Sequence, residues 1–337
     1  MIRLVQLQKG GTRAVAVVEE PRLRLVNDAR SVYELAAEAV ATGRSLTELI
    51  HSKGGDTGLD YDPIYEGRSE WCLLAAVDHP EEPARCLVSG TGLTHLGSAK
   101  NRQAMHSGQE VAQEAELTDS MKMFRWGVAG GKPAPGETGI APEWFYKGPG
   151  SILRGPGEPL VVPAHAEDGG EEAEIAGVYY IGPDGRPWRI GMAAGNEFSD
   201  HKFERKNYLN LAGSKMRTCA LGPELVVNPD FLQVPGTVSI ERAGRTLWTR
   251  DIATGENEMC HGLGNVEHHH FKFAPHRRPG DLHVHYYGAH SLSFGDGLVL
   301  VDGDVMAISF AGFGRALRNP LHVEPPPAAL VAVAVMK

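Results

Sequence analysis

Glu172 and Glu174 are the residues whose type and spacing first suggest chemistry. They stand at the start of residues 171–180, which read as a strand because Ile175 and Val178 favour strands and no helix-period apolar stripe is present. Residues i and i+2 of a strand point to the same face, so the two carboxylates lie side by side. Like charges this close raise one pKa unless a cation lies between them. Taken alone, the pair also fits two solvated carboxylates on an exposed strand.

A third carboxylate follows a second apolar segment. Residues 188–195 are mostly apolar or small, and they end abruptly at Asn196 and Glu197. A buried strand that ends in a carboxylate can deliver a further oxygen ligand. Three carboxylates without Cys or His ligands favour a hard cation, Mg²⁺, Mn²⁺ or Ca²⁺, over zinc.

Three consecutive histidines at 268–270 look like a metal motif at first sight. Adjacent residues on one helix or strand cannot all face one ion, and no second histidine pair has zinc-finger spacing. We therefore do not expect these histidines to bind a metal.

The composition limits the classes of function. The 337 residues exceed one small core, so we expect a small N-terminal α+β domain at 1–78 and a main domain at 79–337. Apolar and charged contents of 42% and 22% are ordinary for a soluble enzyme. A net charge of −9 without a basic cluster argues against nucleic acid and anionic membranes as partners. Scattered cysteines, no signal peptide and no long apolar run predict a cytoplasmic protein.

The elements that must position these residues can be read in chain order. We expect strands at 2–7, 13–18 and 21–26, a helix at 30–42, a capping box at 45–48, a polar loop at 56–70, a strand at 83–90, a Gly-rich loop at 91–102, a long hydrophilic segment at 103–140 and hairpin strands at 231–252. The Gly-rich loop is either an anion-binding turn or a plain connection. The long segment suits a lid or an oligomer contact. The Ala-rich tail after the prolines at 325–327 suits an edge or interface segment.

Several motifs together resemble the fumarylacetoacetate hydrolase superfamily over residues 80–321. The resemblance rests on residues 88–94, 145–149, 172–175, 196–197, 213–215, 221–225, 302–305 and 317–320, in this order. It implies an α+β, mainly β fold, with a mixed β-roll or distorted barrel and a small N-terminal α+β domain. It also implies a homodimer and a Mg²⁺ ion (alternatively Mn²⁺ or Ca²⁺) held by Glu172, Glu174 and Glu197.

Two departures from the family pattern narrow the chemistry. The third ligand is usually Asp, so Glu197 leaves Asp200 as an alternative. Hydrolases of the family carry Asn-Tyr-x-x-His in the lid loop, where this chain has Thr94 and Ser98 in place of Asn and His. Ser cannot activate water near neutral pH as His can, which puts C–C bond hydrolysis in doubt. Ser98 instead resembles the branch of 2-keto-3-deoxy-pentonate dehydratases.

The resemblance assigns roles by position on a small-molecule 2-keto acid substrate. Lys215 is expected to act as the base, as an electrostatic partner of the enolate, or as a plain carboxylate clamp. A partly desolvated Lys beside a metal can be neutral near pH 7. His290 is the alternative acid or base. Substrate contacts are expected from Ser98, Thr94, Arg102, Lys147, Asn196 and Ala289.

Two alternatives remain at this level. The first is a C–C hydrolase or decarboxylase of an acylpyruvate or 2,4-diketo acid, which would need His95 or His290 to activate water. The second is a metal-binding scaffold that has lost activity. Retention of Lys215 with all three carboxylates weighs against the inactive scaffold. The dehydratase would yield 2-oxoglutarate semialdehyde.

Overall fold

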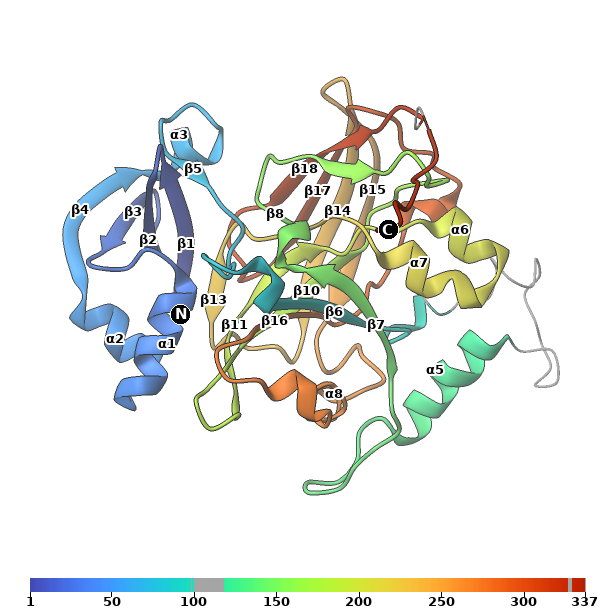
Figure 1. Cartoon of the computed structure of the whole chain (residues 1–337), viewed down its shortest axis with the longest axis horizontal. Coiled ribbons are helices and arrows are strands. Elements are labelled where there is room, and N and C mark those ends of the chain that lie inside the picture. Colours follow the sequence, from blue (N-terminus) through green and yellow to red (C-terminus); the bar gives the residue numbers. More distant parts are fainter. Residues whose placement is uncertain (98, 100–117, 327–328, 337) are drawn as a thin grey trace.

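The computed structural model describes residues 1–97, 99, 118–326 and 329–336, and strands dominate it (Figure 1). The larger sheet has 13 strands, and its main path runs β4 (Gly54–Asp60), β3 (Arg22–Val26), β2 (Thr12–Glu19), β1 (Ile2–Lys9), β13 (Leu225–Val227), β11 (Pro187–Asn196), β10 (Ala173–Ile181), β16 (Leu282–Tyr286), β6 (Cys86–Gly92), β7 (Glu143–Pro149). The short strands β5 (Cys72–Leu73), β8 (Leu153–Arg154) and β12 (Cys219–Leu221) pair off this path. Pairing is mixed, because β16 runs parallel to β6 and antiparallel to β10.

A second sheet has five strands in the order β15 (Arg245–Thr254), β14 (Val234–Arg242), β17 (Val305–Phe310), β18 (Leu317–Val323), β9 (Leu160–Val162). Seven α-helices are described: α1 (Val32–Thr42), α2 (Leu46–Ser52), α3 (Tyr61–Tyr65), α5 (Asp119–Gly130), α6 (His201–Lys206), α7 (Leu211–Lys215) and α8 (Leu263–Phe271). Figure 1 shows α1 and α2 beside the N-terminal strands, and α6 and α7 near the far end of the large sheet. The strand-rich architecture agrees with the predicted mainly β fold.

The N-terminal elements follow the sequence closely. Strands β1 to β3 and helix α1 lie where they were expected, and Gly43 caps α1 with a left-handed φ of 67°. The predicted capping box is present, because Ser45 and Glu48 exchange hydrogen bonds at the start of α2. Antiparallel pairing of β1 with β13 makes these strands part of the large sheet. The division at residue 78 stays a prediction.

Two segments differ from the expected loops. The expected polar loop at 56–70 contains β4 and α3, because pairing with β3 gives a Gly-rich stretch a strand conformation that its own composition does not favour. In the expected long hydrophilic segment at 103–140, residues 103–117 lie outside the described part, but α5 occupies 119–130. The Thr118 hydroxyl accepts a hydrogen bond from the Met121 amide and caps this helix.

The centre of the molecule is the antiparallel pair β10 and β11. All nine residues of β10 are buried, and this strand pairs with β11 on one side and β16 on the other. The register pairs Ala173 with Asn196, which brings Glu172 and Glu197 together just beyond the ladder. The Glu197 amide donates to the Glu172 carbonyl at 3.0 Å. The end of this strand pair therefore positions the carboxylates found in the sequence.

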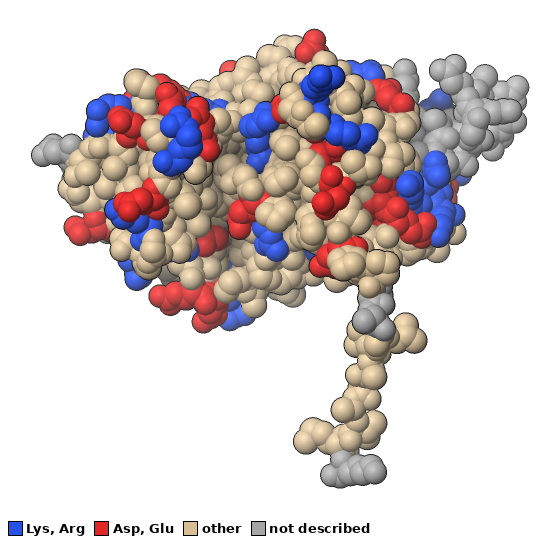
Figure 2. Space-filling model, turned by 90° about the horizontal axis from the view of Figure 1, so that it is seen from above, with Lys and Arg blue, Asp and Glu red and all other residues tan. Residues whose placement is uncertain are grey.

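The surface is charged in a mixed pattern. Figure 2 shows Lys and Arg interspersed with Asp and Glu on the face seen from above. No helix in the described part of the chain is both long and apolar enough to cross a membrane.

Candidate metal centre

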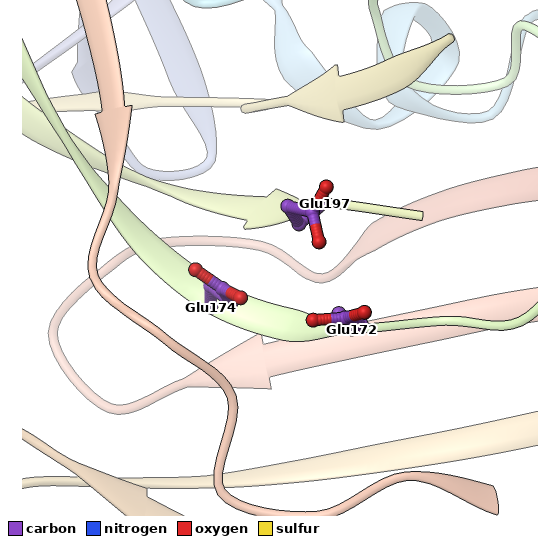
Figure 3. A group of neighbouring side chains, drawn as sticks. All are labelled: Glu172, Glu174 and Glu197. Carbon is purple, nitrogen blue, oxygen red and sulfur yellow. The ribbon is translucent and has the colours of Figure 1, made fainter. Parts of the chain in front are cut away.

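Glu172, Glu174 and Glu197 converge on one buried point (Figure 3). One carboxylate oxygen from each lies within 4.8 Å of the others, and the three residues are at most 7% exposed. Glu174 lies on β10, Glu172 precedes that strand, and Glu197 follows β11. Side chains brought this close without solvent need a positive partner, because burying uncompensated like charges is unfavourable.

Two lysines supply part of that positive charge. The Lys215 ammonium donates to Glu172 Oε1 at 2.6 Å and also to Glu197 Oε2, so it bridges two of the three carboxylates. The Lys147 ammonium donates to Glu197 Oε1 at 2.5 Å and to the carbonyls of Phe198 and Lys215 at 2.9 and 2.8 Å. These three acceptors match the three donors of Lys147. Lys147 thus supports the centre through all three of its donors, and its predicted substrate contact stays a prediction.

The remaining polar contacts fix the carboxylates in place. His201 Nε2 lies 3.1 Å from Glu172 Oε1, and the Ser199 hydroxyl donates to Glu197 Oε2 at 2.9 Å. Burial lowers the pKa of His201, but its hydrogen bond to Glu172 and the charge there outweigh burial and raise the pKa above its usual value. The Gly288 amide donates to Glu174 Oε2 at 2.7 Å. Each of the three carboxylates is therefore held in place by at least one hydrogen bond from a neighbour.

The pKa shifts show that the charge is incompletely balanced. Burial and the charges of Glu197 and Glu172 raise the pKa of Glu174 well above its usual value. Burial likewise raises the pKa of Glu197, helped by Glu172 and opposed by the lysines. Burial also acts to raise the pKa of Glu172, but Lys215 and His201 hold it well below the usual range. Glu174 is thus the member with the least compensation.

A divalent cation fits this environment. In the described part of the chain, Glu174 makes no ion pair, while Glu172 and Glu197 each pair with an ammonium group. Three converging carboxylate oxygens form a hard donor set, which suits Mg²⁺, Mn²⁺ or Ca²⁺. The three residues could hold such an ion, and its charge would provide the compensation that Glu174 lacks.

The other residues predicted for the site divide into two groups. The Thr94 hydroxyl donates to the Tyr287 carbonyl at 2.7 Å and lies 2.8 Å from His95 Nδ1, so it faces the turn at 288–290. In that turn, Ala289 is buried and His290 is half-buried. The Gly288 amide is used by Glu174. Ser98 and Arg102 lie outside the described residues, so their predicted roles stay predictions.

Asn196 and Asp200 are engaged by the protein itself. Asn196 Oδ1 accepts from the Glu172 amide at 3.1 Å, and its Nδ2 points to Met306 Sδ at 3.5 Å. Asn196 therefore fixes the backbone of a carboxylate, and both ends of its amide are occupied. Asp200 caps α6 and contacts Arg217, so it does not join the three carboxylates as the alternative ligand.

Glu143 lies on the same strand face as two residues that contact the metal centre, and the sequence reasoning did not single it out. On β7, Glu143, Phe145 and Lys147 are buried while Trp144 and Tyr146 are exposed, so the first three share one face. Lys147 contacts Glu197, and the Lys215 ammonium lies 4.7 Å from the centre of the Phe145 ring. The Tyr208 hydroxyl donates to Glu143 Oε2 at 2.7 Å. The sequence signal that could have revealed Glu143 is the period-two spacing of a strand, which places it on the same face of β7 as Lys147.

Gly92 creates the space for this carboxylate. Glu143 Oε1 lies 1.9 Å from the position that a Cβ on Gly92 would take, and the two residues are paired across β6 and β7. A side chain at position 92 would displace Glu143. The carboxylate thus occupies a prepared position on the site-facing side of β7.

The histidines of α8 belong to a separate cluster. His270 Nε2 lies 2.9 Å from His283 Nδ1, and Trp144 Nε1 donates to His270 Nδ1 at 3.1 Å. His285 lies between the hydroxyls of Ser89 and Thr91, at 2.8 and 2.7 Å. Burial lowers the pKa of His283 and His285 to about 3, and it lowers the pKa of His270 further. These rings are neutral and bind one another or the sheet.

Comparison with known proteins establishes the fold. No protein-family model matches the sequence, and no curated protein sequence matches it. A solved 2-keto-3-deoxy-D-arabinonate dehydratase, complexed with magnesium and 2,5-dioxopentanoate, matches with a TM-score of 0.70 at 18% identity over 96% of this chain and 99% of that chain. A 5-carboxymethyl-2-hydroxymuconate delta-isomerase from Mycobacterium smegmatis matches with a TM-score of 0.57 at 16% identity over 96% and 100%. Identities this low show a shared fold only, and the predicted mainly β fold is confirmed.

Proposed function

We propose that the protein is a metal-dependent dehydratase of the fumarylacetoacetate hydrolase superfamily. Its substrate would be a 2-keto-3-deoxy sugar acid of the arabinonate or xylonate type, and its product 2-oxoglutarate semialdehyde. The observation that carries the proposal is the buried cluster of three carboxylates bridged by Lys215. The shared fold supports it, because 2,5-dioxopentanoate, named with the solved dehydratase, is the same compound as the proposed product.

Glu172, Glu174 and Glu197 would hold the cation. Its Lewis acidity would make the C3 protons of a bound 2-keto acid more acidic. Lys215 then has the position of the base for a C3 proton, since its side-chain nitrogen lies beside two of the three ligands. It would accept this proton as the neutral amine and become the ammonium ion. Its buried side chain (1% exposed) also keeps this proton transfer away from bulk water. A second role for Lys215, clamping the substrate carboxylate, uses the same position.

Glu143 supplies the acid that the elimination requires. The C4 hydroxyl must leave as water, and a carboxyl group on the face of Phe145 and Lys147 can protonate it. Tyr208 orients this carboxyl group through its hydrogen bond to Oε2. Glu143→Gln should lower kcat by about 10²-fold at unchanged Mg²⁺ affinity, because Gln cannot transfer the proton. Glu137→Gln, at an exposed position, is the matched control.

The hydrolase alternative requires a histidine that can activate water, and the two candidates are His95 and His290. Both ring nitrogens of His95 are engaged, by Thr94 at 2.8 Å and Thr254 at 3.1 Å, and the residue is 1% exposed. Burial also lowers the pKa of His95 to about 3, so this residue does not present a base to water. His290 is half-buried, and its Nδ1 has no hydrogen-bond partner among the described residues. A C–C hydrolase or decarboxylase would depend on His290.

An activity screen separates these functions. The purified chain is incubated with D- and L-2-keto-3-deoxy-pentonates and with 2,4-diketo acids including an acylpyruvate, each with Mg²⁺ and with EDTA. We expect 2-oxoglutarate semialdehyde from a pentonate, only in the presence of metal. Pyruvate plus a free acid would replace the proposal with the hydrolase and make His290 the next target. Mg²⁺ binding without turnover on any substrate would indicate an inactive scaffold.

A further inference from the structure

A cavity lies between the N-terminal helices and the large sheet. Its volume is about 550 Å³, and residues of α1, α2, β11 and β13 line it. Figure 1 shows α1 and α2 beside these two strands. Sites for small molecules have volumes of roughly 300–1,000 Å³ and are often found where two parts of a fold meet. None of the three carboxylates of the metal centre lines this cavity, so it is a separate feature.

The inner surface of the cavity is apolar. Ala36 and Ala39 of α1 line it together with Ile190 of β11, and all three belong to the main hydrophobic core. Val40 and Val227 extend the apolar lining and are only partly buried. A ligand that displaces water from such a surface gains free energy in proportion to the apolar area it covers. The lining therefore favours a ligand with an apolar body.

An indole ring adds an aromatic surface to the cavity. Trp188 lines it and is 39% exposed, although it belongs to a strand of the central sheet. The Arg186 guanidinium lies 4.5 Å from the centre of the indole ring, which helps to hold the ring in place. Aromatic rings attract one another in offset or edge-on arrangements beyond the gain from burial alone. An aromatic ligand thus fits this lining better than an aliphatic one.

Two exposed arginines give the lining a positive charge. Arg44 donates to the Glu48 carbonyl at 3.1 Å and forms no ion pair in the described part of the chain. Arg189 pairs with Glu267 through Nη1, and its other N–H groups have no partner among the described residues. No Asp or Glu occurs among the described residues that line the cavity. Guanidinium groups with donors to spare are suited to a carboxylate.

We propose that this cavity binds a small aromatic carboxylate. The carboxylate group accepts hydrogen bonds from Arg44 and Arg189, and the aromatic body lies against Trp188 and the apolar inner surface. On a chain with a net charge of −9, a lining with two arginines and no acidic side chain is a local exception that selects for an anion. The site is distinct from the metal centre, and the proposal does not depend on the proposed reaction.

Calorimetric titration with 3-phenylpropionate tests the charge and the apolar body separately. EDTA is present throughout, so that no bound cation attracts the carboxylate to the metal centre. We expect 3-phenylpropionate to bind at a single site per chain. The neutral 3-phenylpropionamide and inorganic phosphate should each bind at least about 10-fold more weakly, because the first lacks the charge and the second lacks the apolar body. Absence of 3-phenylpropionate binding at millimolar concentrations, or equal affinity for the amide or for phosphate, would overturn the proposal.

Replacement of one arginine tests the anion contact. Arg44→Gln should weaken 3-phenylpropionate binding by at least about 10-fold, because it removes a charged donor. Arg44 is exposed, so the variant should fold normally, with an unchanged circular dichroism spectrum. Arg30→Gln is the matched control, since Arg30 is an exposed arginine just before the other end of α1. Equal affinity of the Arg44→Gln variant and the unmodified chain would contradict the assigned contact.

Tryptophan fluorescence tests the position of the ligand. Bound 3-phenylpropionate should change the emission of Trp188, which is one of five tryptophans. Trp188→Phe should abolish this change, whereas Trp126→Phe, at an exposed position on α5, should retain it. Val40→Phe places a larger side chain in the cavity and should reduce the calorimetric affinity. A fluorescence change that persists in Trp188→Phe would place the ligand elsewhere and overturn the proposal.

Discussion

The carboxylate centre and the histidine cluster are two buried groups of titratable side chains. They differ in how the cost of burying charge is avoided. Glu172 and Glu197 lie close to the ammonium groups of Lys147 and Lys215. The histidines of the second cluster lose their charge, because burial pushes their pKa values far below the usual range. In the carboxylate centre, Glu174 has the least positive charge beside it. The neutral histidines need no such charge.

This difference separates a binding site from a structural network. A group of charges that the protein does not fully balance attracts a ligand of opposite charge, and such perturbed groups often mark functional sites. Neutral imidazoles that bind hydroxyls and one another support the sheet around β16 and α8. Substitutions in the two clusters should therefore differ in kind.

The largest expected effect is on turnover. Lys215→Met should reduce kcat at least about 10³-fold, because it removes the proposed base, while Mg²⁺ still binds. Steady-state kinetics measure the first effect, and calorimetric Mg²⁺ titration measures the second. Retention of most of the wild-type kcat would exclude Lys215 as the base.

Lys147→Met is the informative partner variant. Both variants replace Lys by Met, so the change in side-chain volume is the same. At position 147 the lost ammonium group is the one that contacts Glu197 and two carbonyls. We expect its main effect on the free energy of unfolding, lowered by about 3–5 kcal/mol because the buried Glu197 carboxylate loses one of its two ammonium partners. Chemical denaturation of both variants measures this difference.

The next effect concerns the metal. Glu174→Gln should weaken Mg²⁺ binding by at least about 10-fold, because it removes one negative oxygen ligand. Glu171→Gln is the matched control, since the neighbouring Glu171 is buried but binds the amide and hydroxyl of Ser293. Equal loss of Mg²⁺ affinity in both variants would show that the three carboxylates are not the ligand set.

The smallest effect is the pH dependence of stability. The pKa of His285 is about 3 in the folded protein and about 6.5 when unfolded. The unfolded state therefore binds the proton first, and stability present above pH 6.5 is lost as the pH falls towards 3. Each such residue contributes a slope of about 1.4 kcal/mol per pH unit in this window.

Replacement of His285 should reduce that slope. His285→Gln removes one titrating ring, so urea denaturation at pH 7.5, 6 and 5 should show a flatter decline in the free energy of unfolding. Mg²⁺ affinity should not change, which contrasts with Glu174→Gln. The exposed His322→Gln is the control. A slope equal to that of the unmodified chain would contradict the neutral buried state of His285.

The sequence predicted the carboxylates because local patterns contain them. Glu172 and Glu174 are two residues apart at the start of one strand, and Glu197 marks the end of the next. Glu143 was missed because its position depends on the pairing of β6 with β7 and on the space at Gly92. The surroundings of His285 depend on Ser89, which is 196 residues away in sequence. Contacts of this range leave no local periodicity from which they could be read.

Other contacts that the sequence did not reveal have the same origin. Lys147 has the residue type of a substrate clamp, but the structure surrounds it with three protein acceptors. The polar stretch at 56–70 gave no strand signal, yet β3 offers it a partner. Strand propensity describes a segment by itself, whereas strand pairing also depends on the neighbouring strand.

Gly288 connects the carboxylate centre to the end of β6. Its amide holds Glu174, its φ of 100° is in the left-handed region, and the Thr94 hydroxyl lies 2.0 Å from where its Cβ would be. Thr94 and Glu174 thus contact opposite sides of a single residue, and a shift of Thr94 would be transmitted to Glu174 if Gly288 moved with it. By thermodynamic reciprocity, a ligand that stabilises this position of Thr94 raises the affinity for the cation by the same factor as the cation raises the affinity for that ligand. Binding of cation and substrate would then be cooperative, whichever of them arrives first.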